Sequence, residues 1–182
     1  MEGDKTIGYE IFAQLGRKVP DWIAVPLGAG AMLTGIYKGF VELKELGFCN
    51  NLPKMIGVQA EGCAPIIDAW EKRHVHVKAW GNCTTIAGAI ADPLTGYEKD
   101  GERTISSIIK SKGYGVKVSD EEIIEELKNL AMYDGLFVET ASATPAAAIR
   151  KLIRCNIISK SDIAIGIVTA HGLKDIEELS AI

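Results

Sequence analysis

The chain has 182 residues, of which 47% are hydrophobic and 24% are charged, so it can build a sizeable core and is not a disordered chain. Its 20 basic and 24 acidic residues are interspersed and its net charge is −4, so the sequence shows no basic patch that would bind nucleic acid or an anionic membrane. No apolar run approaches the roughly 20 residues of a membrane span, and residues 1–5 do not resemble a signal peptide, so we expect a cytoplasmic protein.

Helical and strand-like patterns alternate along the chain. Helices are recognised by apolar residues at a spacing of three to four, and strands by short continuous apolar runs. In chain order, we predict a helix over 6–15, a strand over 22–27, a helix over about 31–46, a strand over 54–60, a helix over 65–70, a short helix over 84–90, a helix over 103–112, a strand over 115–118, a helix over about 120–132, a strand over 136–139, a helix over 141–154, a strand over 163–169 and a helix over 172–179.

This alternation predicts one α/β domain over residues 1–182, a doubly wound and mainly parallel sheet covered on both faces. Ligands bind such sheets at the carboxyl ends of their strands. Three segments that follow predicted strands are therefore candidate parts of a site: Gly28–Met32, Glu139–Ser142 and Thr169–Gly172.

The first of these segments joins a strand to a helix through small residues. Gly28 and Gly30 can adopt backbone conformations that are closed to other residues, and Ala29 and Ala31 add little bulk. The helix that follows would point its free N–H groups into the turn. The segment therefore predicts a site for a phosphate-sized anion; the alternative is a tight turn without a ligand, because G-x-G alone is a weak motif.

Cysteine and histidine residues give weaker signals. The cysteines lie far apart without a C-x-x-C motif, so we expect small buried side chains: Cys49, Cys63, Cys83 and Cys155. His74 and His76 would share one face of a strand, but no further ligands follow at zinc spacing. We predict no metal site.

Six segments then resemble, in order, motifs of the threonine synthase family, and the resemblance extends over essentially the whole chain. The resembling segments are EGDKTIGYEI (2–11), VPLGAGAML (25–33), VQAEGCAPI (58–66), VSDEEI (118–123), FVETASA (137–143) and TAHGLKD (169–175). The resemblance is to the C-terminal half of these enzymes, which depend on pyridoxal 5′-phosphate (PLP) and have fold type II.

The resemblance implies roles for two of the three candidate segments. Gly28, Ala29, Gly30, Ala31 and Met32 would hold the cofactor phosphate with backbone N–H groups. Thr169 would place its hydroxyl against the pyridine nitrogen, which does not force that nitrogen to be protonated as a carboxylate partner would. The alternative for Thr169 is a hydroxyl that caps the helix after Gly172.

This sequence departs from the family pattern in two ways. Family loops carry Asn or Ser where Ala29 stands and Gly where Ala31 stands, so side-chain contacts to phosphate are lost, and Ala31 would be strained if its φ were positive. The "SFKDR"-type segment that carries the cofactor-binding lysine lies in the family's first half and has no counterpart here. We therefore expect no catalytic residue in this chain and no turnover by the chain alone.

The resemblance leaves several functions open. The first is the C-terminal portion of a threonine synthase, a lyase of amino-acid biosynthesis that converts O-phospho-L-homoserine and water to threonine and phosphate. Cysteate synthase or another fold type II synthase or dehydratase is the alternative within the class. A non-catalytic module that binds a phosphorylated ligand, or a partner subunit, is the alternative outside it. The family is usually dimeric, so we expect a homo-oligomer or association with an N-terminal piece.

Overall fold

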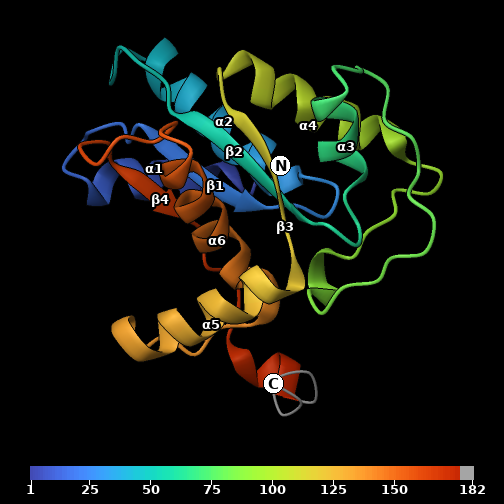
Figure 1. Ribbon diagram of the computed structural model, residues 1–182. Helices are drawn as coiled ribbons and strands as arrows, with labels where there is room; N and C mark the ends of the chain where they lie inside the picture. The colour runs from blue at the N-terminus through green and yellow to red at the C-terminus, as the bar shows by residue number, and fades with distance from the viewer. Residues whose placement is uncertain (177–182) are drawn as a thin grey trace.

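The computed structural model describes residues 1–176, whose centre is a sheet of four parallel strands (Figure 1). The strands lie side by side in the order β3-β2-β1-β4. Their bounds are Trp22–Pro26 for β1, Lys54–Ala60 for β2, Tyr114–Val118 for β3 and Ala164–Gly166 for β4. The parallel register joins Trp22 to Lys54 on one side of β1 and to Ala164 on the other. The predicted parallel α/β fold is therefore confirmed.

Helices cover both faces of the sheet, as Figure 1 shows. One cluster of buried apolar side chains packs one face of the sheet against α5 and α6, and another packs the opposite face against α1 to α4. The helices are α1 Lys5–Gln14, α2 Ala31–Glu45, α3 Pro65–Glu71, α4 Glu98–Lys110, α5 Asp120–Asp134 and α6 Thr140–Arg154, with 3₁₀ turns η1 Gly88–Ile90 and η2 Gly172–Asp175. Within residues 1–176, no helix has the length and apolar character needed to cross a bilayer.

The central strand β1 shows why its sequence is apolar without alternation. Trp22 and Ala24 face the core under α5 and α6, whereas Ile23 and Val25 face the core under α1 to α4. A strand buried on both faces gains about 1.5–3 kcal/mol for each large aliphatic side chain removed from water. This burial favours the continuous apolar runs by which the strands were predicted.

Helix α5 begins with the predicted capping box. The Ser119 hydroxyl accepts a hydrogen bond from the Glu122 N–H at 3.3 Å, and the Glu122 carboxylate accepts one from the Ser119 N–H at 2.9 Å. The helix ends at Gly135, whose φ of +68° is open to glycine at little cost. These two residues determine where α5 begins and ends.

Replacing Ser119 by alanine is expected to lower the free energy of unfolding by about 1 kcal/mol, because the first turn of α5 loses its side-chain acceptor. Urea denaturation followed by circular dichroism measures the change. Ser106 lies within α4 and caps no helix, so Ser106→Ala is the matched control. Equal stabilities for the two variants would show that the capping box contributes nothing measurable.

Several predicted elements were wrong in extent or type. Residues 136–139 do not form a strand; their only ladder contact is an antiparallel bridge between Val138 and His171. The predicted strand over 163–169 is reduced to β4, because it pairs with β1 alone and forms the edge of the sheet. The predicted helix over 84–90 is only η1. Helix α4 begins at Glu98 rather than Arg103, and the predicted last helix appears as η2, while residues 177–179 lie outside the described residues.

Candidate functional site

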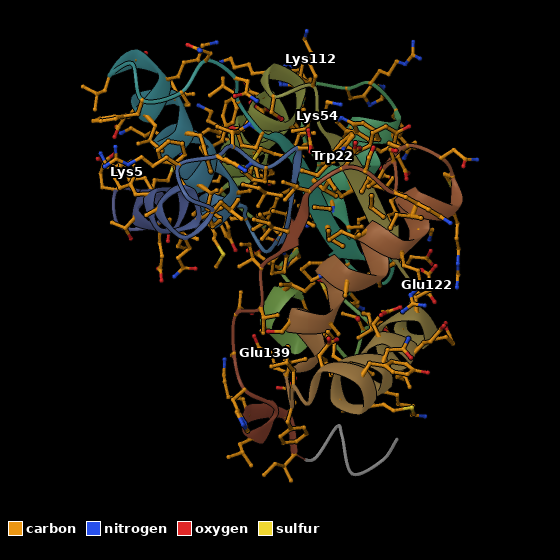
Figure 2. The ribbon with its side chains drawn as sticks, turned by 90° about the vertical axis from the view of Figure 1, so that its left-hand side faces the viewer. Lys5, Trp22, Lys54, Lys112, Glu122 and Glu139 are labelled. Atoms are coloured by element: carbon orange, nitrogen blue, oxygen red, sulfur yellow. A yellow bond between two sulfur atoms is a disulfide. The ribbon has the colours of Figure 1, made fainter. Side chains whose placement is uncertain are left out.

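A cavity of about 280 Å³ opens at the carboxyl end of β1. It lies at the end of the sheet marked by Glu139 in Figure 2, opposite the end marked by Trp22 and Lys54. All six residues predicted to hold a cofactor line this one cavity, although Thr169 is far from the others in sequence. The lining residues are Pro26, Gly28, Ala29, Gly30, Ala31, Met32, Ala89, Ile90, Glu139, Ala141 and Thr169.

The turn from β1 to α2 presents backbone donors to this cavity. Gly30 has a φ of +88° and stands directly before the first residue of α2. Among the hydrogen bonds of residues 1–176, none uses the backbone N–H groups of residues 29–33 as donors. These N–H groups and the positive end of the helix dipole form the usual cradle for a phosphate group. Ala31 is the first residue of α2 and has no positive φ, so the strain expected there does not arise.

Two polar side chains hold this turn from behind. The Thr104 hydroxyl donates to the Ala29 carbonyl at 2.8 Å. The buried Gln59 amide lies 3.5 and 3.4 Å from the carbonyls of Leu27 and Gly28, and its oxygen accepts from two N–H groups at the start of α3. Sequence reasoning missed both residues. The sequence did contain a signal for Gln59: a glutamine within an otherwise apolar, buried strand must find hydrogen-bond partners for its amide.

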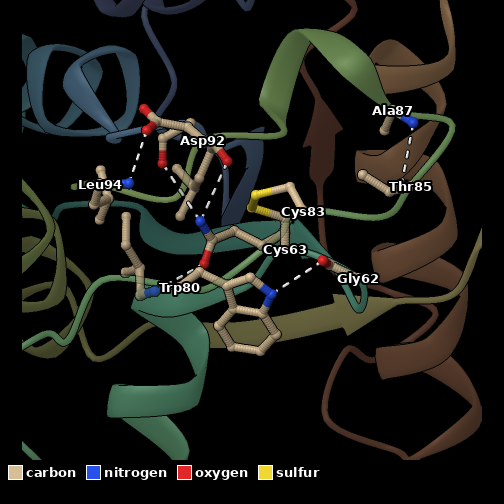
Figure 3. The surroundings of a disulfide bond; sticks show 12 residues. Gly62, Cys63, Trp80, Cys83, Thr85, Ala87, Asp92 and Leu94 are labelled. Carbon is tan, nitrogen blue, oxygen red and sulfur yellow. Dashed lines mark hydrogen bonds between the residues drawn. A yellow bond between two sulfur atoms is a disulfide. The ribbon is translucent and has the colours of Figure 1, made fainter.

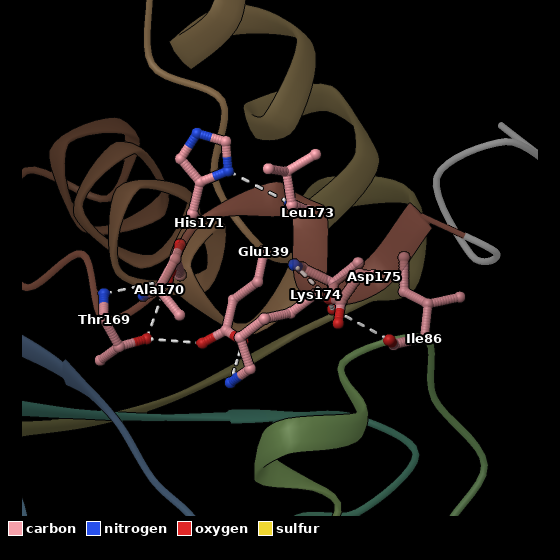
Figure 4. A network of polar contacts seen from close by, with 10 residues as sticks. Ile86, Glu139, Thr169, Ala170, His171, Leu173, Lys174 and Asp175 are labelled. Atoms are coloured by element: carbon pink, nitrogen blue, oxygen red, sulfur yellow. Dashed lines mark hydrogen bonds and ion pairs between the residues drawn. The ribbon is translucent and has the colours of Figure 1, made fainter.

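The opposite wall of the cavity holds Thr169 in a network of hydroxyl and carboxylate groups (Figure 4). The Thr169 hydroxyl donates to Glu139 Oε1 at 2.8 Å and lies 2.8 Å from the Ser142 hydroxyl. It does not cap η2, because the His171 ring takes that position and accepts from the Leu173 N–H at 3.2 Å. The capping alternative for Thr169 is therefore wrong.

Glu139 is nearly fully buried, yet it does not cap α6, which begins directly after it. Its second carboxylate oxygen accepts from the Lys174 ammonium at 3.1 Å. The cap of α6 comes instead from Asp175, which accepts from the Thr140 N–H at 2.8 Å and from the Thr140 hydroxyl at 2.6 Å. The turn η2 thus supplies one charged partner to Glu139 and another to the start of α6.

The segment from residue 72 to 97 brings Ala89 and Ile90 to the cavity. It is attached to the end of β2 by a disulfide between Cys63 and Cys83, and the Trp80 indole and the Thr84 N–H both donate to the Gly62 carbonyl (Figure 3). The prediction that the cysteines are separate, buried side chains was therefore wrong for Cys63 and Cys83, which form this disulfide, and for Cys155, which is exposed. Cys49 and Cys155 are free thiols.

The same segment places Asp92 directly behind Gly28. Asp92 accepts from the Tyr97 hydroxyl at 2.6 Å, and this bond to a carboxylate raises the pKa of Tyr97 above its ordinary value. The carboxylate also accepts from the Leu94 N–H at 3.0 Å. Both bonds are accepted by Oδ1 and hold the Asp92 carboxylate in the loop beside Gly28.

Two other features carry no comparable chemistry. A larger cavity of about 670 Å³ lies against α5, α6 and β4, with mostly apolar walls that include Leu130, Ile149 and Val168. Within residues 1–176, no group of histidine, cysteine and carboxylate residues could hold a metal ion. His76 is exposed and contacts Glu102 at 2.8 Å.

The small cavity fits a phosphorylated aromatic ligand in two respects. One wall offers unpaired backbone N–H groups to a phosphate, and the other offers a hydroxyl to a ring atom. Neither lysine nor arginine is among the lining residues, so a bound phosphate would meet only backbone donors and the dipole of α2.

Comparison with known proteins gives a consistent result. Residues 1–169 match the family model described as "Pyridoxal-phosphate dependent enzyme". The chain is 42% identical over 175 residues to the threonine synthase of Methanocaldococcus jannaschii and, equally, to that of Methanosarcina acetivorans. Each alignment covers 96% of this chain and 42% of the relative. The chain thus spans less than half the length of these curated relatives.

Solved structures show the same fold at lower identity. The processed threonine deaminase isoform 2 of Solanum lycopersicum superposes with a TM-score of 0.76 at 23% identity, over 99% of this chain and 46% of that chain. Maize serine racemase gives a TM-score of 0.71 at 19% identity, over 98% of this chain and 50% of that chain. Both neighbours have fold type II, and the sheet and helices described above have the same arrangement.

Proposed function

Because this chain belongs to the family of pyridoxal-phosphate dependent enzymes, we propose that its 280 Å³ cavity is the phosphate and ring-nitrogen part of a PLP site. The observation that supports this most directly is the meeting of two distant segments, Gly28–Met32 and Thr169, around one cavity. In this assignment the N–H groups of the Gly28–Met32 turn bind the phosphate. PLP supplies the electron sink for reactions at amino-acid carbons, and the protein binds and orients it.

This site is half of a catalytic site. A lysine is needed in this family to carry the cofactor and to act as a base, and no lysine lines the cavity within the described residues. We propose that residues 1–182 are one α/β domain, the C-terminal portion of a longer enzyme, and that a segment with the "SFKDR"-type motif completes the site. The chain by itself then binds cofactor but does not turn over substrate.

The complete enzyme is proposed to be a threonine synthase acting on O-phospho-L-homoserine, a phosphorylated amino acid. The 42% identity to two archaeal threonine synthases supports this choice over the threonine deaminases, which share the fold at 21% and 23% identity. Cysteate synthase is the alternative within the same class. A non-catalytic module for a phosphorylated ligand is the second candidate, and the lysine-free cavity favours it.

The apolar walls of the 670 Å³ cavity beside α5 and α6 suit a covering partner, either a second copy of the chain or the rest of the enzyme. Sedimentation of the chain with and without that partner tests this.

A titration of the chain with PLP tests the proposed site. We expect saturable binding that inorganic phosphate displaces, and no attachment of the cofactor to a lysine after borohydride treatment, as judged by intact mass. Stoichiometric attachment to one lysine would show that the chain carries its own cofactor-binding lysine. Attachment that requires an added N-terminal polypeptide would support an enzyme over the non-catalytic module.

Ala29 offers an isosteric pair of variants for the phosphate wall. Ala29→Asn adds a side-chain donor of the kind found in family loops, and we expect PLP to bind about fivefold more tightly, as one additional hydrogen bond contributes about 1 kcal/mol. Ala29→Asp adds a carboxylate of the same size and should weaken binding through charge repulsion. If both variants bind PLP with the same affinity, the assignment of the phosphate site to this turn is wrong.

A further inference from the structure

A third cavity, of about 520 Å³, lies at the edge of the sheet that β3 forms. The end of α3, one side of α4 and the start of β3 line it, and both helices contact β3 (Figure 1). It shares no lining residue with the proposed cofactor site. We propose that this cavity binds a small ligand that combines a planar ring with an acidic group, either a phosphate or a carboxylate.

Two aromatic side chains provide a wall for a planar ring. Trp70 and Tyr114 are half-buried, and their ring centroids lie 5.1 Å apart at an interplanar angle of 54°. The Trp70 indole packs directly on Gly115, where an added Cβ would come within 2.9 Å of Trp70 Cε3 and 3.0 Å of Trp70 Cδ2. The indole is therefore held against the backbone of β3, and fixed aromatic side chains of this kind bind planar rings by stacking.

The charged side chains of the cavity favour an acidic ligand. Arg73 and His74 are exposed, and neither side chain makes an ion pair or a hydrogen bond with any residue that the structure describes. Glu71 is the only acidic residue among the described lining residues, and its carboxylate pairs with the Lys117 ammonium at 2.7 Å. The Arg73 guanidinium therefore remains available to a ligand, and its fork of N–H groups matches the oxygens of a phosphate or a carboxylate.

Two uncharged donors add to this preference. Within residues 1–176, neither the Trp70 indole N–H nor the Tyr114 hydroxyl forms a hydrogen bond. The Trp22 and Trp80 indoles, in contrast, donate to acceptors at 2.9 and 3.0 Å. Every buried polar side-chain atom of the described residues has a partner, so the two unpaired groups are open to solvent. They therefore suit a ligand that is rich in acceptors.

Apolar side chains explain why an acid alone is a poor match. Val75 and Ile109, whose exposed fractions are 64% and 58%, line the same cavity. A planar ring would cover their apolar surface, which a small acid leaves in water. The volume of about 520 Å³ lies within the range of about 300–1,000 Å³ that is usual for small-ligand sites. The ring and the acidic group are therefore expected in one molecule.

Isothermal titration calorimetry of the chain with adenosine 5′-monophosphate (AMP) and with indole-3-acetate tests the proposal. We expect saturable binding of at least one of them; binding of AMP alone identifies a phosphate ligand, and binding of indole-3-acetate alone identifies a carboxylate ligand. Adenosine and ribose 5-phosphate, which carry only the ring or only the acid, should each bind at least about tenfold more weakly than AMP. Indole and acetate should compare with indole-3-acetate in the same way.

Arg73→Gly removes the guanidinium without straining the chain. Arg73 follows the end of α3 with a φ of +57°, a conformation that glycine adopts more readily. Lys112→Gly is the matched control, because Lys112 follows the end of α4 with a φ of +55°, carries the same charge and does not line the cavity. We expect ligand binding to weaken at least about tenfold in Arg73→Gly and to stay unchanged in Lys112→Gly. Neither variant should unfold at a lower urea concentration than the unaltered chain.

AMP carries a phosphate, as PLP does, so Gly30→Ala, which adds a Cβ to the turn before α2, is the third variant. It should bind AMP as the unaltered chain does. Binding that is lost in Gly30→Ala and kept in Arg73→Gly would place the ligand in the smaller cavity and overturn the proposal, and so would equal binding by Arg73→Gly and Lys112→Gly. The proposal also fails if neither AMP nor indole-3-acetate binds, and the PLP titration described above then still decides the cofactor site by itself.

Discussion

Replacing Gly30 by alanine is expected to weaken PLP binding at least about tenfold, the equivalent of 1.4 kcal/mol in binding free energy. Gly30 has a φ of +88°, which L-residues rarely adopt. An added Cβ would lie 2.2 Å from Thr104 Oγ1 and 2.4 Å from Thr104 Cγ2, so the turn must move away from α4. The backbone N–H groups of the phosphate wall would move with it. Fluorescence titration with PLP measures the loss.

Gly96 separates this effect from backbone strain alone. It has the same φ of +88°, but an added Cβ meets no atom within 4 Å, and it does not line the cavity. Gly96→Ala should therefore lower stability by about 1–2 kcal/mol and leave PLP affinity unchanged. The double change Gly30→Ala with Thr104→Ala removes the closest contacts and should recover part of the affinity. An affinity for Gly30→Ala equal to that of Gly96→Ala would contradict the phosphate assignment.

Loss of the Cys63–Cys83 disulfide is expected to lower the free energy of unfolding by about 3 kcal/mol, the loop-entropy value for a 20-residue closure. The disulfide reduces the number of conformations open to the unfolded chain, and in the folded chain it attaches the segment of residues 72–97 to the end of β2. Urea denaturation with and without a dithiol reductant measures the change. Amide exchange should become faster in this segment, including Ala89 and Ile90 at the cavity.

The free thiols Cys49 and Cys155 must not contribute to this result. A background of Cys49→Ser and Cys155→Ser leaves the disulfide as the only group that responds to the reductant. In that background, Cys63→Ala with Cys83→Ala should have the stability of the reduced chain and show no response to reductant. If reduction leaves stability and exchange unchanged, the disulfide does not restrain the segment.

The sequence predicted those parts of the fold whose signals are local. Strand β2 was predicted with its observed bounds, because a strand buried on both faces is mostly apolar and only Lys54 and Gln59 interrupt this run. The start of α5 was predicted because the Ser119 capping box is a short-range pattern. Helix α4 was predicted to begin too late because its first turn, from Glu98, is polar and lies before the apolar spacing that begins at Ile105.

The candidate site was predictable where it depends on strand ends and not where it depends on tertiary contacts. All three proposed segments contribute residues to the cavity, and two of them follow parallel strands, whose carboxyl ends share one edge of the sheet. Glu139–Ser142 follows no strand and reaches the cavity at the start of α6. Ala89 and Ile90 were missed because they reach the cavity through a segment with little regular structure. The link from Thr169 to Glu139 joins residues 30 positions apart and leaves no periodic signal in the sequence.

The pairing of β4 with β1 has a consequence for how this chain folds. Ile163 N–H donates to Asp21 at 2.8 Å across 142 positions, and the Trp22 indole donates to Asp162 across 140 positions. The entropy lost in closing a loop rises with the logarithm of its length, so this contact is entropically more costly than the nearby pairing of β1 with β2. Such distant pairings raise the contact order and slow folding. Thr169, which follows β4 by three residues, thus joins the cavity through the most distant strand pairing in the sheet.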